Sequence, residues 1–374
     1  MDFEFTAEQL ELRDAARAVL EGACPPSAVR AVFEGAERPA ALTEQLVALD
    51  WAGLAVAEEH GGLGLGFLEL GIVVEELGRA VAPTPLLATL TQLVPMLQES
   101  GRTERLPEVV AGSLTGTLAV AEGISWRPAD VRATARPAEG GWVLEGTKEH
   151  VLDGATADEL VVVARAPGTT GLDGVGAFLV PHDAVTATPR PVPDPTLPLA
   201  TVVLDGTRVG TDRVLVEPGT PGAADAIRRA LEQATTAMAL STVATCRHIF
   251  ETTLQYAKDR VQFDRPIGSF QAIKHRLADC YLAVEKASAL AYFAALTIAE
   301  DDPRRATATA MAKAAAGDCQ RLLVTDGLQL HGGIGFTWEH DLHLLLKRAK
   351  TGDLLFGTAA AHRADLARDV GLAS

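Results

Sequence analysis

The chain has 374 residues, 48% of them hydrophobic and 22% charged, and it carries a formal net charge of -16. This length allows two or three domains around a sizeable core, and the composition excludes a largely disordered chain. The acidic balance argues against nucleic acid or an anionic membrane as the main partner.

The chain is expected to be cytoplasmic. Its first residues are acidic where a secretory signal would carry Lys or Arg, and no stretch approaches the roughly 20 apolar residues of a membrane span. The cysteines are too far apart for a disulfide framework or a CxxC metal pattern: Cys24, Cys246, Cys280 and Cys319.

Residues 1–115 are predicted to form a helical N-terminal domain. Thr6 and Gln9 make a capping box ahead of an apolar-periodic run. The same periodicity predicts helices around residues 42–49, over Phe67–Arg79 and over residues 85–98.

Residues 116–222 are predicted to form a middle β-domain. Val, Thr, Gly and Pro become frequent there, and short β-rich segments alternate with turn residues. That texture is typical of an antiparallel β-domain. The expected strands cover residues 117–121, 142–145, 159–164, 176–181 and 200–204.

Residues 223–374 are predicted to form a C-terminal helical bundle. Phe270, Ile273, Leu277, Cys280, Tyr281 and Val284 recur at spacings of three and four, which gives one apolar face. Further helices are expected over residues 304–331, 340–350 and 353–370. The fold class is therefore α+β, and bundles of this size bind cofactors between helices and at interfaces.

The segment 256–271 reads as a helix end, a polar and aromatic turn, and a new helix that Ser269 starts. Within the turn, Arg260 has the planar fork that grips a pyrophosphate, and Phe263 offers a flat apolar face. The alternative is a helix-terminal arginine at the negative end of the dipole beside a packing phenylalanine.

The segment 329–336 places three glycines after a long helix. Glycines let a ligand approach the exposed backbone N–H groups closely, and Gln329 can hydrogen-bond a phosphate or an adenine edge. The spacing is not that of a Rossmann loop. A helix C-cap needs only one glycine, so the cluster favours a ligand site.

Together these two segments resemble the acyl-CoA dehydrogenase family. The resemblance extends to the N-terminal half, where residues 58–66 read Glu-Glu-His-Gly-Gly-Leu-Gly-Leu-Gly and residues 74–80 read Val-Glu-Glu-Leu-Gly-Arg-Ala. The family fold has a helical N-terminal domain, a β-barrel-like middle domain and a C-terminal four-helix bundle. This order agrees with the three domains predicted from the residue patterns above.

The resemblance implies α,β-dehydrogenation of an acyl-CoA thioester, a reaction on CH–CH donors in lipid metabolism. A carboxylate removes the α-proton while a hydride leaves the β-carbon for FAD, and hydrogen bonds to the thioester carbonyl stabilise the developing enolate. The resemblance also implies an electron-transfer flavoprotein as acceptor and an oligomer built as a dimer of dimers.

The FAD-binding residues that the resemblance implies fall into two groups. Those that match positions holding the nucleotide end of a neighbouring subunit's FAD are Arg260, Gln262, Phe263, Gln329, Gly332 and Gly333. Thr358 matches a threonine that contacts the FAD of its own subunit.

The family's catalytic base has no counterpart in this chain. The usual Glu before Gly-Thr is Phe356 here, and the two alternative positions match Ala234 and Ser241. A Phe cannot accept a proton, and neither Ala234 nor Ser241 is acidic.

The family's flavin-facing elements are altered too. Residues 121–128 read Ala-Glu-Gly-Ile-Ser-Trp-Arg-Pro where the family has Thr-Glu-Pro, and His150 stands where a flavin-facing Trp is usual. His150 is either an acid or base, or a packing substitution.

The residues that match the family's nucleotide-binding positions are present, whereas the base and the flavin-facing residues are replaced. This contrast suggests one subunit of a heteromer, in which a partner subunit carries the base and the flavin pocket. Steroid side-chain degradation in actinobacteria is a setting that resembles this. The alternatives are an active homo-oligomer with a relocated base, a structural subunit without catalysis, and a flavin oxidase or monooxygenase on the same scaffold.

The weak candidates for a relocated base are Asp353 and Glu232. On a helix, Asp353 would lie on nearly the same face as Phe356; its alternative role is that of a helix N-terminal acid. Glu232 is close to Ala234, and its alternative role is that of a solvated acid paired with Arg228. No metal site is expected, because His340 and His343 lack further ligands at zinc-like spacing.

Overall fold

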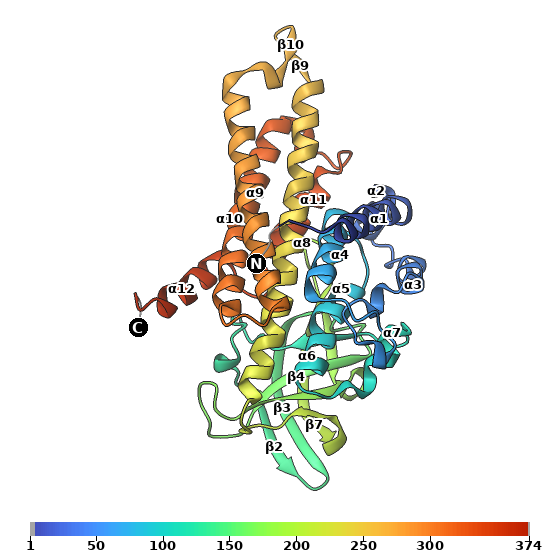
Figure 1. The fold of residues 1–374 in the computed structure, drawn as a ribbon, viewed down its shortest axis with the longest axis vertical. Helices are drawn as coiled ribbons and strands as arrows, with labels where there is room; N and C mark the ends of the chain where they lie inside the picture. Colours follow the sequence, from blue (N-terminus) through green and yellow to red (C-terminus); the bar gives the residue numbers. More distant parts are fainter. Residues whose placement is uncertain (1–3, 373–374) are drawn as a thin grey trace. The chain divides into compact units, whose positions relative to one another are not determined.

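The computed structural model describes residues 4–372 and divides them into two compact units (Figure 1). The first unit contains residues 1–38, 67–83 and 235–374, and the second contains residues 39–66 and 84–234. The division into domains 1–115, 116–222 and 223–374 remains a prediction.

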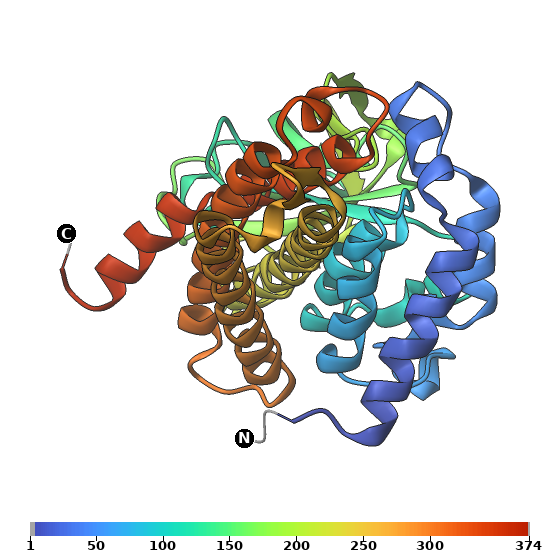
Figure 2. The ribbon, with the colours of Figure 1, turned by 90° about the horizontal axis from the view of Figure 1, so that it is seen from above.

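The first unit is helical. Figure 2 looks down the long helices of its bundle. The helices are α1 (Ala7–Ala23), α2 (Pro26–Phe33), α4 (Phe67–Arg79), the larger part of α8 (Ala223–Asp259), α9 (Gln271–Ala299), α10 (Arg305–His331), α11 (Leu342–Leu354) and α12 (Ala359–Asp369).

The starts of these helices follow from local sequence. The Thr6 hydroxyl accepts a hydrogen bond from the Gln9 backbone N–H and the Gln9 side chain accepts from Thr6, so the predicted capping box of α1 is confirmed. Pro26 opens α2 at a position where its missing N–H costs nothing. The prediction for Ser269 is wrong, because it ends a 3-10 turn and Phe270 precedes α9 instead.

Small side chains let α9 and α10 pack closely. Their buried faces are rich in alanine: Ala287, Ala291, Ala294 and Ala295 on α9, and Ala308, Ala312 and Ala316 on α10. By length and composition α9 could also cross a membrane, so the expectation that no such stretch exists is corrected. Its packing against α10 is that of a bundle helix.

The second unit joins short helices to a sheet. Its helical parts include α3 (Ala40–Ala48), α5 (Leu86–Ala88), a π-helical stretch (Thr89–Leu93), α6 (Val94–Glu99) and α7 (Leu106–Val110). The helix predicted over residues 85–98 is therefore present, and Gln92 in its π-helical stretch accepts a hydrogen bond from the Leu118 backbone N–H at 3.1 Å.

The sheet has eight strands, in the order β6-β7-β3-β2-β4-β5-β8, with β1 paired to β4. The strands are β1 (Gly116–Ala119), β2 (Thr134–Ala138), β3 (Gly141–Leu152), β4 (Glu159–Arg165), β5 (Val175–Pro181), β6 (Thr186–Arg190), β7 (Leu199–Gly210) and β8 (Val214–Val216). All five expected strands are present. Pairing is antiparallel except between β1 and β4 and between β2 and β4.

A buried ion pair ties β3 to the loop after β1. The Lys148 side chain is fully buried, and its Nζ lies 2.6 Å from Glu122 Oε1. The two Glu122 oxygens also accept the backbone N–H groups of Arg132 and Ala133. Glu122, in the segment that departs from the family pattern, therefore holds three separate groups.

Replacing Lys148 with methionine is expected to lower the free energy of unfolding by about 3 kcal/mol, because the Glu122 carboxylate would remain buried without its cation. The matched control is Arg136→Met, which removes an ion pair to Glu145 on the exposed part of the same sheet and is expected to cost below about 1 kcal/mol. Urea unfolding measures both. Equal losses for the two variants would contradict the role given to Glu122.

Candidate functional site

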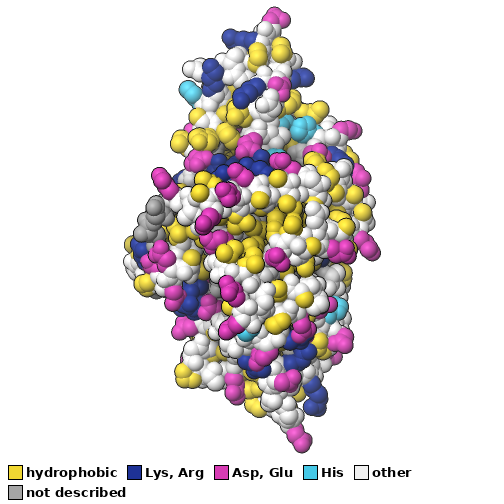
Figure 3. Space-filling model, turned by 45° about the vertical axis from the view of Figure 1, so that its right-hand side comes forward, with side chains coloured by type: hydrophobic (Ala, Val, Ile, Leu, Met, Phe, Trp, Pro, Cys, Tyr) yellow, Lys and Arg dark blue, Asp and Glu magenta, His cyan; other side chains and the backbone are white. Residues whose placement is uncertain are grey.

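The arginine–aromatic turn is a small hairpin at the end of α8. Strands β9 (Val261–Gln262) and β10 (Arg265–Pro266) pair antiparallel, and Phe263 and Asp264 turn between them with φ of 53° and 59°. The Phe263 side chain is 85% exposed. Figure 3 shows hydrophobic and basic side chains together at this tip, with an acidic side chain at its very end.

The Arg260 guanidinium forms no ion pair or hydrogen bond within residues 4–372. Its backbone, in contrast, is fixed: the Arg260 N–H donates to the Tyr256 carbonyl, and its carbonyl accepts from Ile267. Nearby Arg265 is engaged, with its guanidinium 4.1 Å from the centroid of the Phe270 ring. A fixed backbone and an uncommitted cation suit an arginine that binds an external anion.

The glycine segment 332–336 lies next to this hairpin. The Tyr256 and His331 rings stack with centroids 4.4 Å apart, and the Tyr256 hydroxyl donates to the His331 carbonyl at 3.4 Å. His331 is the last residue of α10, and Tyr256 is in the last turn of α8. The structure thus brings both predicted nucleotide-binding motifs to one end of the bundle.

The glycine segment has room for a ligand. A side chain at Gly332 or Gly333 would meet no atom within 4 Å, and Gly332 has a φ of 61°. The Gln329 side chain is exposed and forms no hydrogen bond within residues 4–372. Open space beside free donors is what a phosphate or adenine would require.

Thr358 lies at a different place, as the N-cap of α12. Its hydroxyl accepts from the Ala361 backbone N–H at 3.4 Å. It lines a hollow of about 450 Å³ with the basic side chains of Arg321, Lys350 and Arg363.

Phe356 is buried, 3% exposed, just beyond the end of α11. Its φ of 59° is in the left-handed region, and its carbonyl accepts a hydrogen bond from His362 Nε2 at 2.8 Å. Burial, the first cause, and the charge of Lys313 lower the pKa of His362 to about 4. Phe356, which the resemblance was expected to place at the position of the family's base, is thus a buried aromatic side chain.

Lys313, which no sequence motif marks, hydrogen-bonds to the C-terminal end of α11. Lys313 on α10 is fully buried, and its Nζ donates to the carbonyls of Gly352 and Asp353 at 2.9 and 2.8 Å. Burial lowers the pKa of Lys313 to about 7. In sequence it is one lysine in an alanine-rich helix, so no local pattern marks it.

The geometric argument for Asp353 is wrong. Asp353 is in the last turn of α11, not at a helix start, and the helix ends before Phe356, so the two do not share a helical face. The Asp353 side chain is buried, with Oδ2 3.4 Å from Lys350 Nζ.

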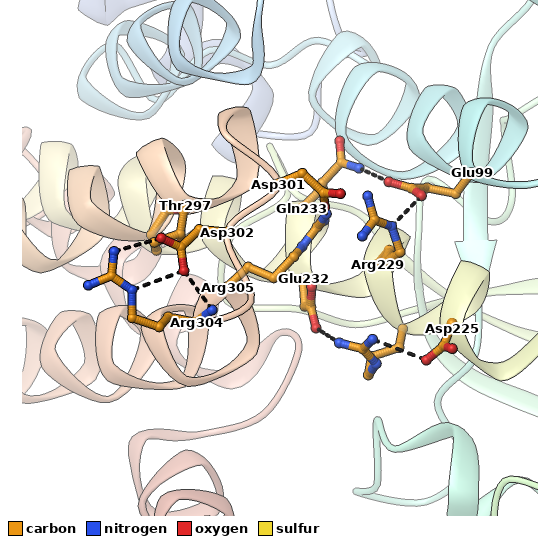
Figure 4. A network of polar contacts seen from close by, with 12 residues as sticks. Glu99, Asp225, Arg229, Glu232, Gln233, Thr297, Asp301, Asp302, Arg304 and Arg305 are labelled. Atoms are coloured by element: carbon orange, nitrogen blue, oxygen red, sulfur yellow. Dashed lines mark hydrogen bonds and ion pairs between the residues drawn. The ribbon is translucent and has the colours of Figure 1, made fainter. Parts of the chain in front are cut away.

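The expected ion pair of Glu232 with Arg228 is present, with Oε1 2.5 Å from Nη1 (Figure 4). Glu232 is buried rather than solvated as its alternative role assumed. Arg228 also reaches Asp225 at 3.1 Å. The Glu232 carboxylate is thus engaged by an arginine in an ion pair.

The two residues expected at the family's alternative base positions, Ala234 and Ser241, are on α8 and are each 1% exposed. Gly78 of α4 lies so close to Ser241 that a Cβ there would come within 2.6 Å of its hydroxyl oxygen. His150 has a φ of 55° at an irregularity of β3, and its ring stacks on Trp126 with centroids 6.5 Å apart. A packing role for His150 agrees with this contact.

The family models and the relatives that match this chain all point to the same family. Residues 6–117 match the N-terminal domain and residues 222–371 the C-terminal domain of acyl-CoA dehydrogenases. Acyl-CoA dehydrogenase IpdE2 of Mycolicibacterium smegmatis is 34% identical over 317 residues, covering 84% of this chain and 82% of that protein.

Solved structures agree with these matches. A variant of the Tcur3481–Tcur3483 steroid ACAD is 31% identical with a TM-score of 0.86, and the match covers 97% of each chain. The ChsE4–ChsE5 complex from Mycobacterium tuberculosis is 25% identical with a TM-score of 0.90 over the full length of both chains.

Proposed function

This chain belongs to the acyl-CoA dehydrogenase family, and on that premise we propose that it is a base-lacking subunit of a heteromeric, FAD-dependent acyl-CoA dehydrogenase. In this proposal it completes the FAD site of a partner subunit, and the partner supplies the catalytic carboxylate. The observation that carries the proposal is the contrast between an open nucleotide-binding end and a buried Phe356 at the position of the base.

The side chains at the end of α8 and α10 fit the nucleotide part of FAD. Arg260 is a free cation for the pyrophosphate, Phe263 is an exposed ring for adenine, and Gln329 is a free donor and acceptor. Gln262, Gly332 and Gly333 complete this set, and Thr358 would contact a flavin from its own side. When bound, FAD accepts the hydride that leaves the substrate β-carbon.

Removal of the substrate α-proton requires a carboxylate that is free to accept it. Phe356, Ala234 and Ser241 offer none, and the two remaining candidates are engaged by cations, Glu232 by Arg228 and Asp353 by Lys350. A second subunit with a Glu at one of the three family positions would supply the missing group.

The relatives support a particular substrate class and assembly. The ChsE4–ChsE5 structure is a complex of two named chains, and the Tcur3481–Tcur3483 protein is a steroid ACAD. We therefore propose a steroid-derived acyl-CoA as substrate, a second acyl-CoA dehydrogenase chain as partner, an electron-transfer flavoprotein as acceptor and the cytoplasm as location.

The test is a visible spectrum of the purified chain, alone and co-expressed with a candidate partner from its genome neighbourhood. We expect a colourless chain alone and a yellow complex whose flavin band bleaches anaerobically with a steroid acyl-CoA. A chain that is yellow alone and bleaches with acyl-CoA would make it an active homo-oligomer. Rapid reoxidation in air with peroxide or an oxygenated product would make it an oxidase or monooxygenase.

A further inference from the structure

A cavity of about 550 Å³ lies within the first unit, among α1, α2, α4, α8, α11 and the segment before α11. Figures 1 and 2 show these helices side by side. The volume is within the range of small-molecule pockets. None of the residues expected to bind FAD lines it, so the cofactor does not account for it.

The wall of the cavity is largely aliphatic. It is made of buried side chains from four segments: Leu20, Val29, Val81, Leu342, Leu344 and Leu345. Such a wall favours a ligand with an apolar body, since each methylene group transferred from water to the cavity contributes about 0.8 kcal/mol to the free energy of binding.

The charges around the cavity disfavour an anionic ligand. Arg17 is held by both oxygens of Glu76 at 2.7 and 3.0 Å, and Arg79 pairs with Glu251 at 2.6 Å. Each arginine is thus engaged by a carboxylate, although Arg79 Nη1 has no hydrogen-bond partner within residues 4–372. The lining still carries more acids than arginines, and two of these acids form no ion pair within the same residues: Glu21 and Glu339. A carboxylate or the phosphates of CoA would meet a net negative charge here.

The hydrogen bonds of two lining histidines fix their tautomers. His248 Nδ1 lies 2.8 Å from the Arg79 carbonyl, which can only accept, and burial lowers the His248 pKa, so the ring is neutral and its Nε2 is a bare acceptor. His340 Nδ1 accepts the Leu342 N–H at 3.1 Å, so its Nε2 carries the proton and is a donor.

Both Nε2 atoms are available to a ligand. Neither has a hydrogen-bond partner within residues 4–372, and neither is sealed from solvent. The cavity thus presents one acceptor and one donor, and the Thr252 hydroxyl lies one turn after His248 on α8. A single hydroxyl group satisfies both roles, since it donates one hydrogen bond and accepts others.

We propose that this cavity binds an uncharged lipid alcohol, with its apolar body against the leucine and valine wall and its hydroxyl between His248 and His340. None of the residues expected to bind FAD lines the cavity, although the His340 ring contacts that of His331, the residue before Gly332, with centroids 5.0 Å apart; the ligand needs no CoA. The lipid alcohol is therefore expected to bind whether or not the chain has a partner subunit.

The test is calorimetric titration of the purified full chain with decanol, decanoate and methyl decyl ether, each below its solubility limit. Decanol is expected to bind one per chain. Decanoate should bind at least about tenfold more weakly because of its charge, and the ether about tenfold more weakly because it cannot donate to His248. The comparison among ligands uses the wild-type chain, so it does not depend on any variant folding.

The matched variants are His248→Phe and His340→Phe, with His275→Phe as control because His275 is exposed on α9 and does not line the cavity. The first two are expected to weaken decanol binding about tenfold, while the control leaves it unchanged. Equal binding of decanol and the ether, stronger binding of decanoate, or no binding of any of the three would overturn the proposal.

Discussion

Replacing Arg260 with alanine is expected to weaken FAD binding by about ten- to a hundredfold in the assembly that carries the cofactor. The Arg260 guanidinium has no protein partner in residues 4–372, so its removal breaks no internal contact. A charge-assisted hydrogen bond to a phosphate contributes about 1.5–3 kcal/mol, which corresponds to that loss of affinity. The measurement is the recovery of flavin fluorescence on dilution.

The matched control is Arg265→Ala, five residues later on the same hairpin. Arg265 is already stacked on Phe270, so we expect an affinity within about threefold of wild type. Arg260→Lys should recover part of the affinity, because an ammonium keeps the charge without the planar fork. Normal FAD binding by the Arg260→Ala assembly would refute the role given to this hairpin.

Replacing Lys313 with alanine is expected to lower the free energy of unfolding by about 3 kcal/mol. The substitution leaves the carbonyls of Gly352 and Asp353 without their shared donor and opens a void in the bundle. The matched control is Lys350→Ala, since Lys350 is exposed and contacts the Asp353 carboxylate at 3.4 Å; its loss should cost below about 1 kcal/mol.

The loss at Lys313 should also depend on pH. The pKa of Lys313 is about 7 in the folded chain because of burial, against about 10.4 for an unfolded lysine. Between these values the unfolded chain binds more protons than the folded one, so the wild-type chain becomes more stable as pH rises. The destabilisation by Lys313→Ala is therefore expected to be larger at pH 9 than at pH 6 in urea titrations. An equal or smaller loss at pH 9 would mean that Lys313 stays charged when buried.

Lys313 also bears on the segment around Phe356. It fixes the end of α11, and directly after that end the chain turns through Phe356 and Gly357 with φ of 59° and 94°. His362 then fixes the Phe356 carbonyl. The segment that holds Phe356 is thus anchored on both sides.

The sequence by itself determined the helices and the hairpin. The capping box at Thr6, the bounds Phe67–Arg79 and the long helix ending at His331 all depend on residues within one or two turns of each other, so a local pattern is sufficient. The same holds for the polar and aromatic turn around Phe263, whose residues are adjacent in the chain; that it is a two-stranded hairpin was not predicted.

Only the tertiary structure decided which polar groups are engaged. From sequence spacing, Asp353 is expected on the same helical face as Phe356. In the structure α11 ends between the two residues, and Lys313 of α10 hydrogen-bonds to a carbonyl at that end. The sequence likewise predicts a solvated Glu232, although helix packing buries it. Burial and the approach of distant segments come from how helices pack, which no local periodicity encodes. The 550 Å³ cavity, built from five helices, has the same origin.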